Sequence, residues 1–176
     1  LTALCRDSKV QLRVNGQLLT TVVMDSKIQG DIALYVDSSE LHIDFQRVEV
    51  YSTMEMGELL FSDDFSDNRN DWFVDPKGQY AYLENGAFHL AGASINEFGI
   101  TYTARAYNFS DFACQAEVTK ISGPDDKGYG LMFGCMVSGC LCFSVRSDGY
   151  FSLDRYSFAD STWESELTWT PSNAIN

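Results

Sequence analysis

The chain has 176 residues, of which 45% are hydrophobic and 14% aromatic, and its 12 basic and 25 acidic side chains give a formal net charge of −13. This length and composition predict one folded domain with a single core, and they exclude an intrinsically disordered chain. The negative charge argues against nucleic acid and anionic lipid as partners, and no apolar run is long enough to span a bilayer, so membrane insertion is not expected.

The chain begins with segments in which apolar and polar residues alternate, and this period of two predicts strands. Residues 10–14 and 18–23 form the first predicted hairpin, joined by Asn15-Gly16, a pair typical of a type I′ turn. A short apolar strand is predicted over 32–36.

The next predicted strand, 41–51, changes the phase of its apolar residues halfway along. Phe45 belongs to one phase and Val48 to the other, and the change falls at Gln46-Arg47. This predicts a β-bulge, because otherwise some apolar side chains of this strand would face water. Residues 53–57 show no alternation and are predicted to be a turn or linker.

The rest of the chain continues as short strands separated by frequent turn signals. A second Asn-Gly turn, Asn85-Gly86, joins the predicted strands 80–83 and 88–90. The other predicted strands cover 59–65, 99–104, 112–121, 129–136, 140–146, 150–156 and 163–168. This pattern predicts an all-β fold of two packed antiparallel sheets, a β-sandwich or jelly roll, with a closed barrel as the alternative.

The five cysteines match neither a zinc site nor a redox CxxC motif, so disulfides or buried thiols are expected. They are Cys5, Cys114, Cys135, Cys140 and Cys142. A turn at Ser138-Gly139 would place Cys135 opposite Cys142, whereas a turn at Val137-Ser138 would place it opposite Cys140. We favour the first pairing, because Ser-Gly is the better turn pair.

Several motifs carry a family resemblance. Residues 60–67, followed by Trp72, resemble the first strand of concanavalin-A-like (laminin-G-like) jelly-roll domains of secreted bacterial proteins. Residues 128–133 and 143–150 resemble the central hairpin of those domains. The N-terminal part is similar to the last strands of the same family, in particular residues 43–50.

The order of these segments is rotated relative to the family. Residues 1–52 are similar to its closing strands, 53–57 to a linker, and 58–176 to its opening and central strands. The rotation predicts a circularly permuted sandwich, a sandwich completed by a neighbouring subunit, or one period of a tandem array. The resemblance also implies a secreted, extracellular or cell-surface location.

Two groups of side chains are candidates for binding or catalysis. Glycan stacking is the function that exposed aromatic rings predict. The candidates are Trp72, Tyr80, Tyr82, Tyr102, Trp163 and Trp169. Glu164 and Glu166 share one face of a predicted strand beside two of these tryptophans, and they are the nearest approach to a paired-carboxylate site. The acidic run of catalytic family members is missing, so no catalytic residue is assigned.

A structural calcium ion is the one cofactor that the sequence suggests. Asp63, Asp64 and Asp67, together with Asp44 of a neighbouring strand, are the candidate ligands. Calcium needs six to eight oxygen ligands, which carboxylates and loop carbonyls can supply. No other cofactor is expected.

Three functions follow from these observations. The leading hypothesis is a non-catalytic extracellular structural module that self-associates head to tail, by strand complementation, into a filament, sheath or surface array. The alternative is a carbohydrate-binding module of a secreted enzyme or adhesin, with neutral glycans as ligands. The third is a glycan hydrolase or lyase that uses Glu164 or Glu166 as acid or base.

Overall fold

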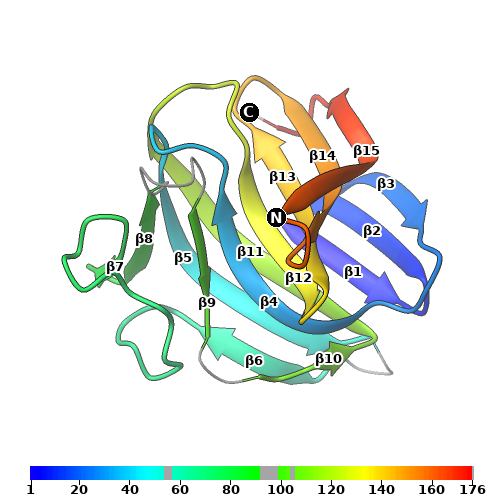
Figure 1. Cartoon of the computed structure of the whole chain (residues 1–176), viewed down its shortest axis with the longest axis horizontal. Coiled ribbons are helices and arrows are strands. Elements are labelled where there is room, and N and C mark those ends of the chain that lie inside the picture. Colours follow the sequence, from blue (N-terminus) through cyan, green and yellow to red (C-terminus); the bar gives the residue numbers. More distant parts are fainter. Residues whose placement is uncertain (54–56, 92–98, 104–105, 176) are drawn as a thin grey trace.

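A computed structural model describes residues 1–53, 57–91, 99–103 and 106–175. These residues form fifteen strands, and none of them lies in a helix (Figure 1). The strands make two antiparallel sheets packed around a common core, so the predicted all-β sandwich is confirmed and the closed barrel is excluded. The jelly-roll connectivity and the rotated strand order stay predictions.

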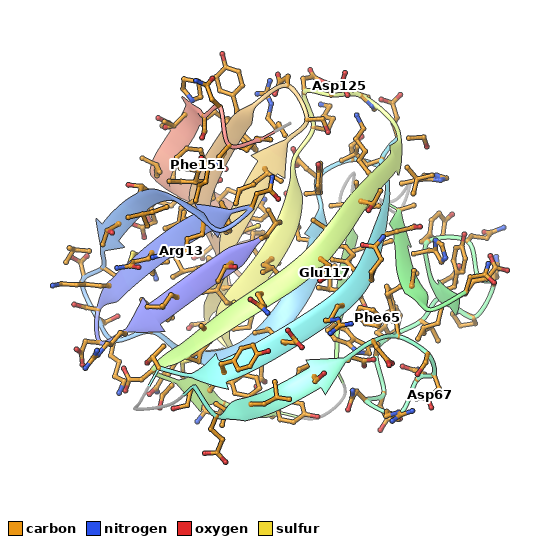
Figure 2. The ribbon with its side chains drawn as sticks, turned by 180° about the vertical axis from the view of Figure 1, so that it is seen from behind. Arg13, Phe65, Asp67, Glu117, Asp125 and Phe151 are labelled. Carbon is orange, nitrogen blue, oxygen red and sulfur yellow. A yellow bond between two sulfur atoms is a disulfide. The ribbon has the colours of Figure 1, made fainter. Side chains whose placement is uncertain are left out.

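Sheet A has eight strands in the order β3-β2-β1-β11-β5-β8-β7, and β6 also pairs with β5. These strands are β1 (Thr2–Arg6), β2 (Lys9–Val14), β3 (Gln17–Val23), β5 (His42–Ser52), β6 (Leu59–Asp63), β7 (Ala81–Glu84), β8 (Ala87–Ala91) and β11 (Phe112–Ser122). Figure 2 looks onto the outer face of this sheet, from which Arg13 and Glu117 project.

Sheet B has seven strands in the order β10-β4-β12-β13-β14-β15, and β9 also pairs with β4. These strands are β4 (Gln29–Val36), β9 (Gly99–Tyr102), β10 (Phe109–Ser110), β12 (Tyr129–Met136), β13 (Gly139–Arg146), β14 (Tyr150–Ser157) and β15 (Thr162–Pro171). Figure 1 looks onto sheet B, with sheet A behind it. The side of sheet B that points away from sheet A is called the outer face of sheet B below.

Both predicted Asn-Gly hairpins are present. Asn15 and Gly16 have φ angles of 50° and 77° between β2 and β3, and Asn85 and Gly86 have φ angles of 52° and 74° between β7 and β8. Two successive positive φ angles are what a type I′ turn requires.

The predicted bulge in β5 is also present. Phe45 pairs with Val118 and Arg47 pairs with Glu117, so Gln46 is the extra residue. The bulge turns Phe45 and Val48 towards the same side, and both are fully buried in the core. The change of apolar phase in the sequence therefore marks a real irregularity of the strand.

The strands of residues 1–52 pair with later strands of the same chain. In sheet A, β11 lies between β1 and β5, and in sheet B, β4 pairs with β12. The two parts also share one core. The predicted linker 53–57 lies partly outside the described residues. The two residues that flank it are in contact, because Ser52 N donates a hydrogen bond to Glu58 O at 2.8 Å.

The favoured cysteine pairing is wrong. Met136 pairs with Gly139, so the turn is Val137-Ser138, and the disulfide joins Cys135 to Cys140. Gly139 is needed for a close approach to β14 and not for the turn, because a Cβ there would lie 2.1 Å from Tyr156 O. The other three cysteines, Cys5, Cys114 and Cys142, are buried free thiols.

Candidate functional site

The outer face of sheet B carries an apolar layer of its own, separate from the core between the sheets. Its buried members are Ala33, Tyr35, Met132, Cys140, Cys142 and Tyr156. An antiparallel sheet that faces water on one side normally presents polar residues there. The apolar layer therefore distinguishes this face as a candidate binding surface.

Strand alternation builds this face from two distant parts of the chain. On β14, Phe151 and Leu153 enter the core, so Ser152 and Asp154 point to the outer face. On β4, Leu34 enters the core, and its neighbours in the strand point outwards. The two strands reach the same face because β12 and β13 lie between them in sheet B.

Three aromatic rings meet across the outer face of sheet B. The ring centroids of Tyr35 and Trp163 are 5.5 Å apart, and those of Tyr156 and Trp163 are 4.7 Å apart. Tyr35 lies on β4 and Trp163 on β15, four strands away, a separation of about 19 Å in a flat sheet. The sheet therefore curves towards this face, and Trp163, which is 40% exposed, lies at its edge.

A second exposed tryptophan covers another part of the same face. Trp169 Cη2 would lie 3.0 Å from a Cβ at Gly128, so the indole occupies the space that a side chain there would fill. The Arg146 guanidinium carbon lies 5.1 Å from the Trp169 ring centroid and 5.0 Å from that of Tyr150. Arg146 also forms an ion pair with Asp148, which holds it against both rings.

Two carboxyl groups lie beside the aromatic rings. Ser152 Oγ donates to Asp154 Oδ2 at 2.7 Å, and Tyr35 Oη donates to Asp37 Oδ1 at 3.0 Å. Burial raises the pKa of Asp154, and the negative charge of Asp37 raises it further. Asp154 therefore keeps its proton to a higher pH than an ordinary aspartate, and a protonated carboxyl group can both donate and accept hydrogen bonds.

Two other groups of the face are neutral. Burial is the main cause that raises the pKa values of Tyr35 and Cys142, so the phenol and the thiol stay protonated at neutral pH. Cys142 Sγ and Ser144 Oγ lie 3.3 Å apart. The face thus combines aromatic rings, hydroxyl groups and two carboxyl groups.

Only part of the predicted aromatic set lies on this face. Trp163 and Trp169 do, and Tyr102 lies on β9 of the same sheet, where its backbone pairs with Ala33. Tyr80 precedes β7 in sheet A, and Tyr82 lies on β7, half-buried and stacked on His89 with centroids 4.7 Å apart. The candidates therefore do not form a single platform.

Trp72 was a candidate for stacking on a glycan, and this prediction is wrong. Its side chain is 2% exposed and packs in the core against Phe65 and Phe88. Its indole Nε1 donates to Asp63 Oδ2 at 2.7 Å, which satisfies the one polar atom of the ring inside the core. Trp72 is therefore a structural residue.

The four calcium candidates are engaged with other partners. Asp63 is buried and accepts hydrogen bonds from Phe65 N, Asn70 Nδ2 and Trp72 Nε1 at 2.7–2.8 Å. Its oxygens are therefore committed to the loop that follows β6, where Figure 2 labels Phe65 and Asp67.

The other three carboxylates do not converge on Asp63. Asp64 accepts from Ser66, Asp67 accepts from Arg69, and Asp44 Oδ1 lies 2.6 Å from His89 Nδ1. Across the ranges that the structure describes, no three His, Cys, Asp or Glu side chains are grouped so that they could hold a metal ion. Structural calcium stays a prediction without a ligand set among these residues.

The predicted glutamate pair faces away from the aromatic rings. Glu166 Oε1 accepts from Arg155 at 2.6 and 2.8 Å, and Glu164 pairs with Arg155 across the two strands. Trp163 pairs with Tyr156, and neighbouring residues of a strand point to opposite sides. The glutamates therefore hold Arg155 and do not line the candidate site.

Sequence reasoning missed Tyr35, Asp37 and Asp154. The alternation in 151–156 already separates Phe151 and Leu153 from Ser152, Asp154 and Tyr156, so it was a usable signal. It does not reveal that β4 joins the same face, because that depends on pairing between distant strands.

Comparison with known proteins does not assign the chain to a family. No protein-family model matches it, and no curated protein matches it in sequence. The resemblance to concanavalin-A-like domains stays a prediction that rests on the motifs. Within the described part of the chain, no helix is long and apolar enough to cross a membrane.

Proposed function

We propose that this chain is a carbohydrate-binding module that binds a neutral glycan on the outer face of sheet B. The observation that carries the proposal is the exposed ring of Trp163, which contacts the buried rings of Tyr35 and Tyr156 and lies on the same face as the Asp154 carboxyl group. Aromatic rings stack on the apolar faces of sugars, and sugar hydroxyl groups need partners that both donate and accept.

The charge of the molecule favours a neutral ligand. With a net charge of −13, the chain repels anionic glycans at long range. The Cys135–Cys140 disulfide supports the further proposal that the module works in an oxidising compartment, as secreted and cell-surface proteins do.

Strand complementation, the leading hypothesis from the sequence, receives less support. It would require strands of residues 1–52 to leave their own sheets, in which β1 and β5 pair with β11 and β4 pairs with β12. A binding module needs no such rearrangement.

Glycan hydrolysis is a second candidate, favoured by one observation. Asp154, whose pKa is raised by burial, and the exposed Asp37 interact electrostatically on one face, and glycan hydrolysis uses a pair of carboxyl groups of which one donates a proton and the other accepts one. Release of reducing ends from a bound glycan would distinguish this activity from binding alone.

A glycan array followed by calorimetric titration tests the proposal. Trp163→Ala and Asp154→Asn should each weaken binding of the best glycan at least about tenfold, which corresponds to about 1.4 kcal/mol. Phe73→Ala is the matched control, because Phe73 is 55% exposed and lies outside the proposed site.

Intrinsic fluorescence provides a second measurement. Of the three tryptophans, Trp72 is buried and the other two lie on the outer face of sheet B, so binding should change the emission of the exposed pair.

Wild-type protein that binds no glycan on the array, or a control variant that loses as much affinity as Trp163→Ala, would contradict the proposal.

A further inference from the structure

The edges of the two sheets differ in how well they are protected against the addition of another strand. An open edge presents unpaired backbone groups, and proteins usually blunt it with short strands, bulges, charges or proline. Among the described strands, β7, β9 and β10 have four residues or fewer, and β6 has five. The edge strand β15 is longer, with ten residues, but it has two register shifts against β14 and carries Glu164 and Glu166.

The edge strand β3 has almost none of these protections. Its seven residues, Gln17–Val23, contain no charged residue, no proline and no glycine, and β2 is its one neighbour in sheet A as described. One register shift lies in its first half, and Thr20–Val23 continues in regular pairing with β2. Leu18 and Val23 are 52% and 68% exposed. This edge combines high β-propensity with open backbone groups.

The charge near β3 also differs from that of the rest of the chain. Residues 1–24 contain three basic side chains and one acidic one, whereas residues 25–176 contain nine basic and 24 acidic ones. Lys9 pairs with Val23, and Arg13 pairs with Leu18, so two of the basic residues lie directly beside β3. This edge therefore carries little of the negative charge that makes two copies of this acidic molecule repel each other.

We propose that β3 pairs in antiparallel register with β3 of a second copy of the chain, about a twofold axis. Two copies of sheet A would then form one continuous sheet across the dimer. Because β3 is uncharged, self-pairing places no like charges directly opposite each other, and its threonine and valine residues form favourable cross-strand pairs. This dimer requires no strand to leave its own sheet.

The pairing goes beyond glycan binding and has a consequence for it. A dimer presents two copies of the outer face of sheet B, so a polymeric glycan could be bound at two points, with higher avidity than one module provides. The dimer itself does not depend on whether a glycan binds, so the two proposals can fail separately.

Sedimentation and light scattering test the pairing over protein concentrations from about 1 μM to about 1 mM. The wild-type chain should change from monomer to dimer within this range. The double variant Thr21→Lys, Val23→Lys replaces two exposed residues of β3, and it should weaken dimerisation at least about tenfold because it places like charges across the twofold axis.

Thr119→Lys is the control. Thr119 is exposed on β11 in the middle of sheet A, so a lysine there adds positive charge away from the β3 edge. This variant should dimerise like the wild type. Wild-type protein that is monomeric at every concentration would overturn the proposal, as would a β3 variant that dimerises as strongly as the control.

Hydrogen exchange of the wild-type protein keeps the test decisive if the β3 variant does not fold. Amide protons of β3 should become more protected as the concentration rises, whereas those of β15 should not. Protection of β3 that is independent of concentration would also overturn the proposal.

Discussion

Two aspartates, one in the core and one on the outer face of sheet B, show what a carboxyl group does in this protein. Asp63 lies in the core with three donors within hydrogen-bond distance, and it holds the loop after β6 around Trp72. Asp154, which is partly buried on the outer face of sheet B, accepts hydrogen bonds from the hydroxyl groups of Ser152 and Ser165 and interacts electrostatically with Asp37. The first aspartate serves the fold, and the second is the one that we propose to meet a ligand.

The raised pKa of Asp154 predicts how stability depends on pH. The unfolded chain loses this proton at a pH of about 4, whereas the native state keeps it to a higher pH. The free energy of unfolding therefore falls as pH rises from about 4 through the native pKa, and it levels off above that pKa. Asp154→Asn should remove this fall, and urea unfolding at several pH values between about 2 and about 7 measures it.

Asp64→Asn is the control for this prediction, with the opposite sign. Hydrogen bonds from Ser66 lower the pKa of Asp64. The contribution of the Asp64 carboxylate to the free energy of unfolding is therefore present at neutral pH and is lost as pH falls through the native pKa. If both variants changed the pH profile in the same direction, the assignment of Asp154 would be wrong.

At the scale of elements, bulges decide which side chains share a face. The bulge at Gln46 could be predicted, because the apolar phase of β5 changes there and both phases are buried. The bulge in β12 between Phe133 and Met136 could not, because Gly134 and Cys135 are only half-buried and carry no phase signal. This missed bulge accompanies the wrong cysteine pairing.

The disulfide should stabilise the β12–β13 hairpin by about 2 kcal/mol, the magnitude expected when a disulfide closes a loop of only a few residues. Cys135→Ser, Cys140→Ser should therefore lower the free energy of unfolding in urea by about this amount. Reductant should have the same effect on the wild-type protein and none on the double variant. A wild-type protein insensitive to reductant would contradict the pairing.

At the scale of the whole molecule, the first 52 residues and the last 119 are interleaved. Leu1 and Ile175 line the same hollow of about 650 Å³, and Asn15 Nδ2 donates to Ala174 O at 3.1 Å beside it. The first strands and the last residues of the described chain therefore lie close together, and the rotated strand order itself stays a prediction.

A circular permutant tests that prediction. We expect a chain joined from residue 176 to residue 1 by a flexible linker, and opened between residues 53 and 57, to fold with a loss of no more than about 2 kcal/mol. Circular dichroism and urea unfolding measure the outcome. A permutant opened instead at Glu117, inside the strand that joins β1 to β5, should not fold. Failure of the first permutant would contradict the rotated arrangement.

Much of the fold could be predicted because its signals are local. Period-two alternation, the two Asn-Gly turns and the phase change at Gln46 all depend on residues within one or two strands. The candidate site could not be predicted in the same way. It depends on Tyr35 and Trp163 meeting from opposite ends of sheet B, and on the burial of Trp72, which no local pattern reveals.

The pairing of early strands with late ones has a consequence for synthesis of the chain. Thr2 pairs with Gln115, so β1 must wait for roughly a hundred further residues, or roughly 5 to 20 s at the usual rate of translation. Until β11 and β12 emerge from the ribosome, β1 cannot be joined to β5 in sheet A and β4 cannot be joined to β13 in sheet B, so neither sheet is complete. Such non-local pairing also slows folding. The nascent chain is therefore most exposed to aggregation, and most in need of a chaperone, before the sandwich exists at all.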